Sequence, residues 1–341
     1  MDSLTHIALG ACIGQAFFKK DFGRKAMAWG ALAQSLPDID FVAGFWMGIP
    51  EELLAHRGFT HSVLFILLMA PVLAMGAARL HRPPAIPFQK LAFFFLLEMG
   101  VHLLLDGFNN YGVGWLEPFS HQRFSFNMIY VADPLFSIWP VLAALILLRK
   151  KISDRTRRTW QRIGIILPAC YLVYCGVNKL KIDNDTRAIL ASQQIEYTRY
   201  FTTPAPLNNW LWYVVAGNDS GYHVGFRSVF DRSKKIRFEY FPRNSHLLES
   251  FVTDEDMHRL IRFSQDFYTV EQWSDTLVFN DLRFGQVTGW DSPRGHFVFH
   301  YYLHHPDTAR TLSNDLVVQR GRFKNWNWQT AKRLLRRMWG E

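Results

Sequence analysis

The sequence has few cysteines, and they form no pattern that would tie a fold together. Only three occur in 341 residues, Cys12, Cys170 and Cys175, and all lie in apolar segments. No CxxC pair is present, and an odd number of thiols leaves at least one unpaired. A disulfide framework and a thiolate metal site are therefore excluded, and we expect the three thiols to be small core residues.

Two further patterns are missing. The first residues, Met1 to His6 (MDSLTH), lack the basic region that opens a signal peptide, so we expect the first apolar segment to be retained in the mature protein. No Gly-x-Ser-x-Gly motif is present, which argues against a Ser/His/Asp hydrolase. With 49% hydrophobic and 20% charged residues, the composition also excludes a disordered or collagen-like chain.

Hydrophobic residues are distributed unevenly along the chain. Six apolar segments precede residue 180, whereas the remainder has the composition of a soluble domain. The segments are Thr5–Phe18, Ala26–Leu36, Ser62–Ala78, Leu91–Leu105, Pro134–Leu148 and Ile163–Leu180. A full membrane span needs about 20 apolar residues, and shorter runs can be half-buried. We therefore predict two domains: a membrane-embedded bundle of about six α-helices over residues 1–180, and a soluble α+β domain over 181–341.

Basic residues gather between the apolar segments. The loops 19–25, 79–90 and 149–162 are all basic, and the last carries seven Lys and Arg residues. Basic loops of this kind remain in the cytoplasm. This orientation places residues 1–6, 37–61, 106–133 and everything after 180 on the opposite side. The net charge of +9 could indicate nucleic acid, but basic membrane flanks explain it better, and we do not expect nucleic acid as the main partner.

The second half alternates short β-like runs with turns and predicts a mainly antiparallel sheet. The expected strands are Trp210–Ala216, Tyr222–Val229, Ile236–Phe241, Leu277–Phe279 and Phe297–Leu303, and the expected helices are Asp254–Phe267 and Thr330–Trp339. The last helix is basic over Lys332–Arg337 and follows Trp326 and Trp328. It could lie on a membrane interface, but we favour a helix packed on the domain by its apolar face.

Four groups of polar residues interrupt the apolar half. They are His6; Asp38 and Asp40 in PDID; His56, Arg57 and His61 in HRGFTHS; and His102 and Asp106 in HLLLD. Ionisable groups in or beside apolar helices are costly and usually face a functional cavity. His102 and Asp106, four residues apart, share one helix face with Glu98. All four groups fall on the predicted extracytoplasmic side.

Neutral imidazoles and carboxylates without a thiolate suit a divalent metal, Zn²⁺ first and Mn²⁺ as the alternative. Three carboxylates and four imidazoles suffice for one ion, or for two that share a carboxylate. Taken singly, each group has an ordinary explanation: His6 as a helix cap, Pro37-Asp38 as a turn, and the others as loop or chance residues. Their convergence on one face favours a metal site.

In their order, these motifs resemble the YdjM-type family of bacterial inner-membrane proteins, described as metal-dependent hydrolases, over about residues 1–140. More distantly, the arrangement is similar to zinc-dependent phospholipase C and the related single-strand nucleases, which are all-helical enzymes. The resemblance implies a multi-pass inner-membrane protein. It also implies a first metal on Asp40, on His56 or His61, and on His102 and Asp106, with His6 for a second metal. The chain departs from the soluble enzymes in starting with Met1 rather than a processed Trp, and it lacks their later His-x-x-x-Glu/Asp pair.

The leading hypothesis is a membrane-embedded metal-dependent hydrolase of a phosphoester or lipid-linked substrate. Asp38 would orient or deprotonate a metal-activated water, and Arg57 could hold a phosphate through two hydrogen bonds. Asn109, Asn110 and Asp133 are either supporting residues or simple loop residues. The alternatives are a transporter or ion-binding protein that uses the same His/Asp cluster, and a non-catalytic membrane anchor stabilised by a metal.

Overall fold

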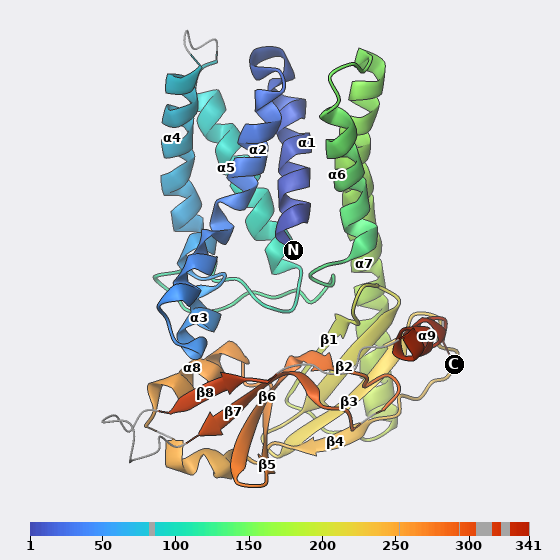
Figure 1. The fold of residues 1–341 in the computed structure, drawn as a ribbon. Coiled ribbons are helices and arrows are strands. Elements are labelled where there is room, and N and C mark those ends of the chain that lie inside the picture. Colours follow the sequence, from blue (N-terminus) through green and yellow to red (C-terminus); the bar gives the residue numbers. More distant parts are fainter. Residues whose placement is uncertain (82–85, 252, 293, 305–315, 322–327, 341) are drawn as a thin grey trace. The chain divides into compact units, whose positions relative to one another are not determined.

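All six apolar segments form helices. The computed structural model describes residues 1–341 except 82–85, 252, 293, 305–315, 322–327 and 341; Trp326 therefore lies outside the described residues. The helices of the first half are α1 (Ser3–Phe22), α2 (Lys25–Ser35), α3 (Ile49–Ala55), α4 (Val63–Leu80), α5 (Phe88–Gly107), α6 (Pro134–Leu147) and α7 (Asp154–Ser192), with short 3₁₀ helices η1 (Pro37–Phe45) and η2 (Phe59–His61). Figure 1 shows the long helices side by side.

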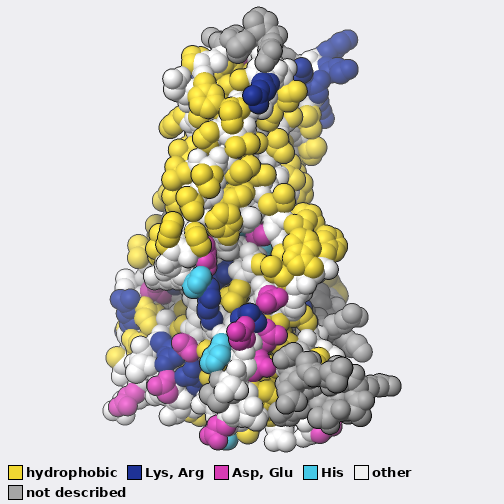
Figure 2. Space-filling view, turned by 90° about the vertical axis from the view of Figure 1, so that its left-hand side faces the viewer, with side chains coloured by type: hydrophobic (Ala, Val, Ile, Leu, Met, Phe, Trp, Pro, Cys, Tyr) yellow, Lys and Arg dark blue, Asp and Glu magenta, His cyan; other side chains and the backbone are white. Residues whose placement is uncertain are grey.

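Three of these helices, α4, α5 and α7, are long and apolar enough to cross a membrane. α6 is apolar but shorter, and α2 has only 11 residues, so a count of about six spanning helices is not confirmed. Leu67, Leu68 and Val72 on α4 and Val173 on α7 are exposed, and Figure 2 shows a hydrophobic surface over the helices on the side that faces the viewer. Such a surface is stable in lipid rather than in water. α7 continues as a polar helix to Ser192, beyond the predicted end of its apolar run.

The chain divides into two compact units: residues 1–42, 55–176 and 206–208 form the first, and residues 43–54, 177–205 and 209–341 form the second. In the first unit α1 packs against α2 and α6, and α5 packs against α4 and α2. The α1–α2 contact is close because glycines face one another. A Cβ at Gly30 would meet the carbonyl oxygen of Gly10 at 2.0 Å, and one at Gly14 would meet that of Ala26 at 2.2 Å. Small residues of this kind let membrane helices approach closely.

The second unit contains two four-stranded antiparallel sheets. The first has the order β1 (Arg199–Pro204), β2 (Leu211–Gly217), β3 (Gly221–Ser228), β4 (Glu239–Pro242), and the second has β5 (Tyr268–Trp273), β6 (Thr276–Gln286), β7 (Phe297–His304), β8 (Val317–Arg320). Tyr213 and Val224 from the first sheet and Leu282 and Phe297 from the second share one hydrophobic core. The predicted mainly antiparallel domain is confirmed.

Each predicted strand of the second half overlaps an observed one, while β1, β5 and β8 carry no strong alternation and were not expected. The predicted helix Asp254–Phe267 is shorter, α8 (Glu255–Phe263), after the 3₁₀ helix η3 (Ser245–Phe251). Its N-cap Asp254 accepts hydrogen bonds from the first turn, and left-handed Gln265 and Asp266 end it. The last helix, α9, spans Trp328–Met338 and packs through Leu334 and Met338.

Candidate metal centre

Two 3₁₀ helices and one membrane helix supply the polar residues. Pro37 ends α2 and opens η1, which carries Asp38 and Asp40. η2 carries His61, and α5 carries His102 and Asp106 one turn apart. All belong to the first unit. Segments more than 60 residues apart in the sequence therefore meet, as the polar pattern predicted.

Asp38, His61, His102 and Asp106 each offer one atom to a group within which all atoms lie within 4.8 Å of one another. Nε2 of His61 lies 3.5 Å from Asp38 Oδ1 and 3.4 Å from Asp106 Oδ2. Nε2 of His102 lies 3.5 Å and 3.6 Å from the same two oxygens. Ligands about 2.1 Å from a tetrahedral zinc are separated by roughly 3.4 Å. The spacing of these four atoms therefore fits a tetrahedral cation site.

Hydrogen bonds on the far side of each ring determine which nitrogen carries the proton. His102 Nδ1 lies 2.6 Å from the carbonyl oxygen of Gln34, which can only accept, so Nδ1 is the donor. His61 Nδ1 lies 3.2 Å from Asp40 Oδ2, which likewise accepts. In the neutral rings both Nε2 atoms then carry lone pairs, and they face each other at 3.1 Å. Two lone pairs at this distance repel unless a cation or a proton lies between them, so a bound metal ion would stabilise this arrangement.

Three of the four candidate ligands, His61, His102 and Asp106, are fully buried, whereas the Asp38 side chain is 19% exposed. Asp106 Oδ2 is buried and accepts no hydrogen bond within the described part of the chain. Asp38 is held on its outer side by the Ser3 hydroxyl, which donates to Oδ2 at 3.1 Å. The group is therefore closed on most sides and opens at Asp38.

Asp40 and His56, both predicted as ligands, lie outside this group of four: Asp40 contacts His61 of the group, and His56 contacts Asp40. Asp40 accepts from His61 Nδ1, from the Arg57 backbone N–H at 2.7 Å and from the Thr60 hydroxyl, while its other oxygen meets His56 Nδ1 at 3.1 Å. Burial alone would raise the pKa of Asp40, but the hydrogen bonds from His56 and His61 lower it far below its ordinary value. Asp40 is thus an ionised carboxylate that orients a ligand ring, the arrangement of carboxylate–histidine–metal triads.

His6, predicted for a second metal, lies beside the group. Its ring stacks on His102 at 3.8 Å, and its Nε2 lies 3.2 Å from Asp106 Oδ1, the oxygen that also contacts the Met1 amino group. Its Nδ1 meets Gln34 Oε1 at 3.1 Å, and Gln34 Nε2 donates to buried Glu98 at 3.2 Å. Glu98 thereby fixes the Gln34 amide, so that His6 lies between the Gln34 oxygen at Nδ1 and the Asp106 carboxylate at Nε2.

Arg57 is buried and lies against Asp106. Its Nε lies 3.0 Å from Asp106 Oδ2, and Nη1 donates to Asn109 Oδ1 at 2.7 Å. Its φ of +58° lies in the left-handed region, a strained conformation for a side chain of this size that is typical of functional sites. Asp133 instead accepts from the first backbone N–H groups of α6, as an N-cap.

Besides Ser3 and the Met1 amino group, Gln34 and Thr60 contact the site and were not predicted. Gln34 holds both His6 and His102, and its signal was an amide within the apolar run of α2, where a buried polar side chain requires partners. Thr60 lies within the HRGFTHS motif and contacts both Asp40 and His61. Because neutral polar side chains add no charge to the sequence pattern, their part in the site becomes apparent only from their contacts in the structure.

An apolar helical unit that encloses a His/Asp group able to bind metal defines a membrane protein with a candidate metal centre. Residues 1–182 match the family described as YdjM inner membrane protein, and the chain belongs to this family.

Two curated relatives extend the comparison. The chain is 32% identical over 124 residues to the inner membrane protein YbcI of Escherichia coli K12, covering 36% of this chain and 69% of that protein. It is 31% identical, over 97% of both chains, to a Bacillus subtilis 168 protein named uncharacterized protein YfhP. No solved structure matches.

Proposed function

We propose that this chain is an integral-membrane, metal-dependent hydrolase of a phosphoester or lipid-linked substrate. The observation that carries the proposal is the pair of facing Nε2 atoms of His61 and His102, with Asp38 and Asp106 at ligand distance. The donor set of two imidazoles and two carboxylates suits Zn²⁺, with Mn²⁺ as the alternative. His6 and Asp106 Oδ1 are the groups available to a second ion.

A divalent cation held there would polarise a phosphoester oxygen and acidify a water molecule. Asp38 is the one ligand candidate that reaches the surface, so its second oxygen can accept a proton from an incoming nucleophile. Arg57 neutralises Asp106 and provides a guanidinium for a phosphate oxygen. Leu4 follows Ser3, Ile39 and Phe41 flank Asp40 in the sequence, and all three are exposed, which favours a substrate that carries an apolar chain.

The position of the site within the first unit favours an extracytoplasmic reaction. The α1–α2 and α6–α7 connections lie at the opposite end of the helices from Met1 (Figure 1), and they are joined there by the Lys19–Asp154 ion pair. Met1 contacts Asp106 of the site. With the basic connections in the cytoplasm, the metal centre and the C-terminal domain fall outside it. A transporter ranks second as a candidate, because its permeation pathway would need ionisable groups throughout the depth of the membrane.

The test is metal analysis of the detergent-purified protein beside His102→Ala and Asp106→Asn, with phosphodiester and phospholipid hydrolysis measured in parallel. His121→Ala is the matched control, because this histidine is exposed and pairs with Glu117. We expect both site variants to lose metal and hydrolysis, and the control to keep both. Full metal content in both site variants would reject the ligand set, and hydrolysis without metal would reject the mechanism.

A further inference from the structure

The last helix has two different faces. Thr330, Leu334 and Met338 are buried, and the last two pack against Ala205 and Leu211 of the sheet domain. The opposite face is exposed and carries a stripe of large apolar and basic residues that recur at helical spacing: Trp328, Lys332, Leu335, Arg336 and Trp339. The packed amphipathic helix expected from the sequence is therefore present, but packing uses only one of its faces.

Exposure of the apolar members of the stripe is large. Trp328 is 69% exposed, Leu335 50% and Trp339 67%. Trp339 stacks on Phe230 at 5.5 Å, so the domain fixes its ring while leaving much of its surface free. A soluble protein rarely exposes two indoles and a leucine on one short helix without a partner.

The charges on this helix are unevenly balanced. No acidic residue occurs over residues 328–340, whereas four basic residues do. Two of them have acidic partners elsewhere in the domain: Arg333 pairs with Asp291, and Arg337 holds Asp231 by two hydrogen bonds of 2.7 and 2.9 Å. Lys332 and Arg336 have no acidic partner among the described residues. The unbalanced cations are thus the two that lie on the exposed stripe.

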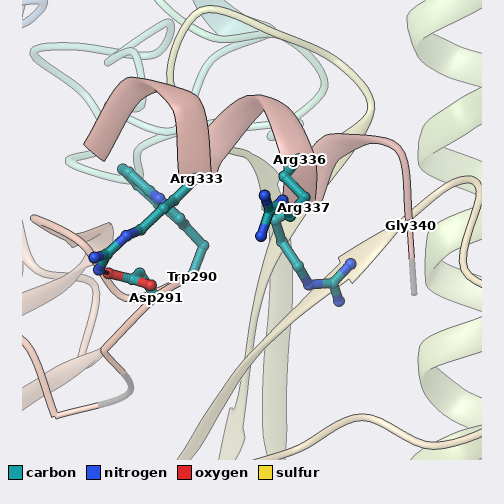
Figure 3. Close-up of a pocket in the computed structure, with 6 residues that line it drawn as sticks. All are labelled: Trp290, Asp291, Arg333, Arg336, Arg337 and Gly340. Carbon is teal, nitrogen blue, oxygen red and sulfur yellow. Dashed lines mark hydrogen bonds and ion pairs between the residues drawn. The ribbon is translucent and has the colours of Figure 1, made fainter. Parts of the chain in front are cut away.

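A pocket of about 320 Å³ opens beside Arg336. It is lined by Trp290, Asp291, Arg333, Arg336, Arg337 and Gly340, and Figure 3 shows these side chains beneath α9, with Arg333 extended toward Asp291. The volume is sufficient for a phosphate-bearing headgroup, and Arg336 is its one arginine without an acidic partner among the residues described. The apolar stripe and a cationic pocket therefore adjoin on the same helix.

We propose that the exposed stripe of α9 docks on the surface of an anionic phospholipid bilayer, with Trp328, Leu335 and Trp339 in the interface and Lys332 and Arg336 on lipid phosphates. Aromatic rings at headgroup depth combined with cations on the same helix define interfacial membrane binding. Charge complementarity favours this occupant over a protein surface, because the charged members of the stripe, Lys332 and Arg336, are both cations and stand beside exposed indoles. The inference does not depend on hydrolysis or on the metal centre.

The experiment uses the full chain in nanodiscs of phosphatidylcholine, with or without phosphatidylglycerol. A nitroxide is attached at Leu335→Cys in a Cys170→Ser background, which removes the one exposed native thiol. Its collisions with oxygen, which enriches in lipid, are compared with those of a water-soluble nickel chelate. The matched control is a label at Asp275→Cys, in the exposed β5–β6 turn of the same domain.

With phosphatidylglycerol we expect the oxygen-to-nickel ratio to rise several-fold at residue 335 and to stay at its aqueous value at residue 275. Lys332→Gln with Arg336→Gln should lower the docking equilibrium about fivefold per removed cation, and high salt should act in the same direction. Lys234→Gln with Lys235→Gln, two exposed lysines of the same domain, should leave it unchanged. An aqueous label at 335 in both nanodiscs would overturn the proposal, as would a label shielded from both reagents, which indicates a protein contact instead.

Discussion

Asp40 and His61 form a carboxylate–imidazole pair, with Asp40 Oδ2 3.2 Å from Nδ1 and the opposite Nε2 among the four candidate ligands. The carboxylate therefore fixes the ring and its tautomer without occupying a ligand position. Removing such an outer partner lowers metal affinity by about 10–100-fold. We expect this loss for Asp40→Asn, measured by metal titration of the metal-free protein.

The matched variant is Asp38→Asn, two residues earlier on η1. Asp38 offers its oxygen directly to the candidate site, so its loss should weaken binding much further than the loss of Asp40. If instead Asp40→Asn removed all metal while Asp38→Asn retained it, Asp40 would be the metal ligand, as the family resemblance implied. Asp38 would then be the outer partner.

A second prediction concerns the close contact of α1 and α2. In Gly30→Ala the new methyl group would lie 2.0 Å from the Gly10 carbonyl oxygen and 2.8 Å from Glu98 Oε1, so the helices must separate. Overpacking of this kind costs about 1–3 kcal/mol, and it also moves His6 on α1 away from Gln34 on α2. We expect a lower Tm in detergent and weaker metal binding.

Gly76→Ala is the control for this substitution. Gly76 lies in α4, and an added Cβ meets nothing within 4 Å. Alanine is the better helix former by about 1 kcal/mol, so Tm should stay level or rise. A decrease as large as that of Gly30→Ala would show that the effect does not come from the α1–α2 contact.

The third prediction concerns the buried chain from Glu98 through Gln34 to His6. Gln34→Met keeps the side-chain size but leaves Glu98 and His6 without their partner, a loss of about 1–3 kcal/mol in the free energy of unfolding. Adding Glu98→Met should recover part of this loss, since a buried polar pair replaced by apolar groups is nearly neutral. Thermal unfolding in detergent measures both. A double variant less stable than Gln34→Met would contradict a shared role.

The helices and the clustering of the polar residues were predictable from the sequence. Long apolar runs have few alternatives to membrane helices, and buried ionisable groups need a shared environment. The His102–Asp106 spacing placed both on one face of α5, where both are buried. The short β-like runs at β2, β3 and β7, separated by turns, likewise predicted the antiparallel domain.

The assignment of individual ligands was not predictable. Asp38 and Asp40 are two residues apart, and in a 3₁₀ helix of three residues per turn their side chains point about 120° apart around the helix axis. Side chains that point in such different directions do not both face the centre of the site, and the sequence alone does not show which of the two aspartates does. Arg57 was expected to hold a phosphate, but its ion pair with Asp106 was not expected. That contact depends on the left-handed backbone at Arg57, which residue type does not reveal.

The final prediction follows from the Arg57–Asp106 ion pair, in which Nε lies 3.0 Å from Oδ2. Arg57→Gln leaves the buried Asp106 carboxylate with the Met1 amino group as its remaining cationic partner, and the loss of one partner of a buried ion pair costs up to about 3–5 kcal/mol. A bound metal ion would neutralise the same carboxylate, so the loss should be large without metal and smaller with it. We therefore expect added Zn²⁺ to raise the Tm of Arg57→Gln by more than it raises that of the native chain. Hydrolysis should fall about 100-fold if the guanidinium stabilises phosphate charge.

Arg123→Gln provides the comparison, since Arg123 also packs on the Tyr111 ring but donates to the carbonyl oxygens of His56 and Gly112. Its replacement removes neutral hydrogen bonds worth about 0.5–1.5 kcal/mol each, with or without metal, so the shift in Tm on adding Zn²⁺ should equal that of the native chain. An equal shift in Arg57→Gln as well would mean that Arg57 and the cation do not share Asp106. The site would then hold its charge balance through another group.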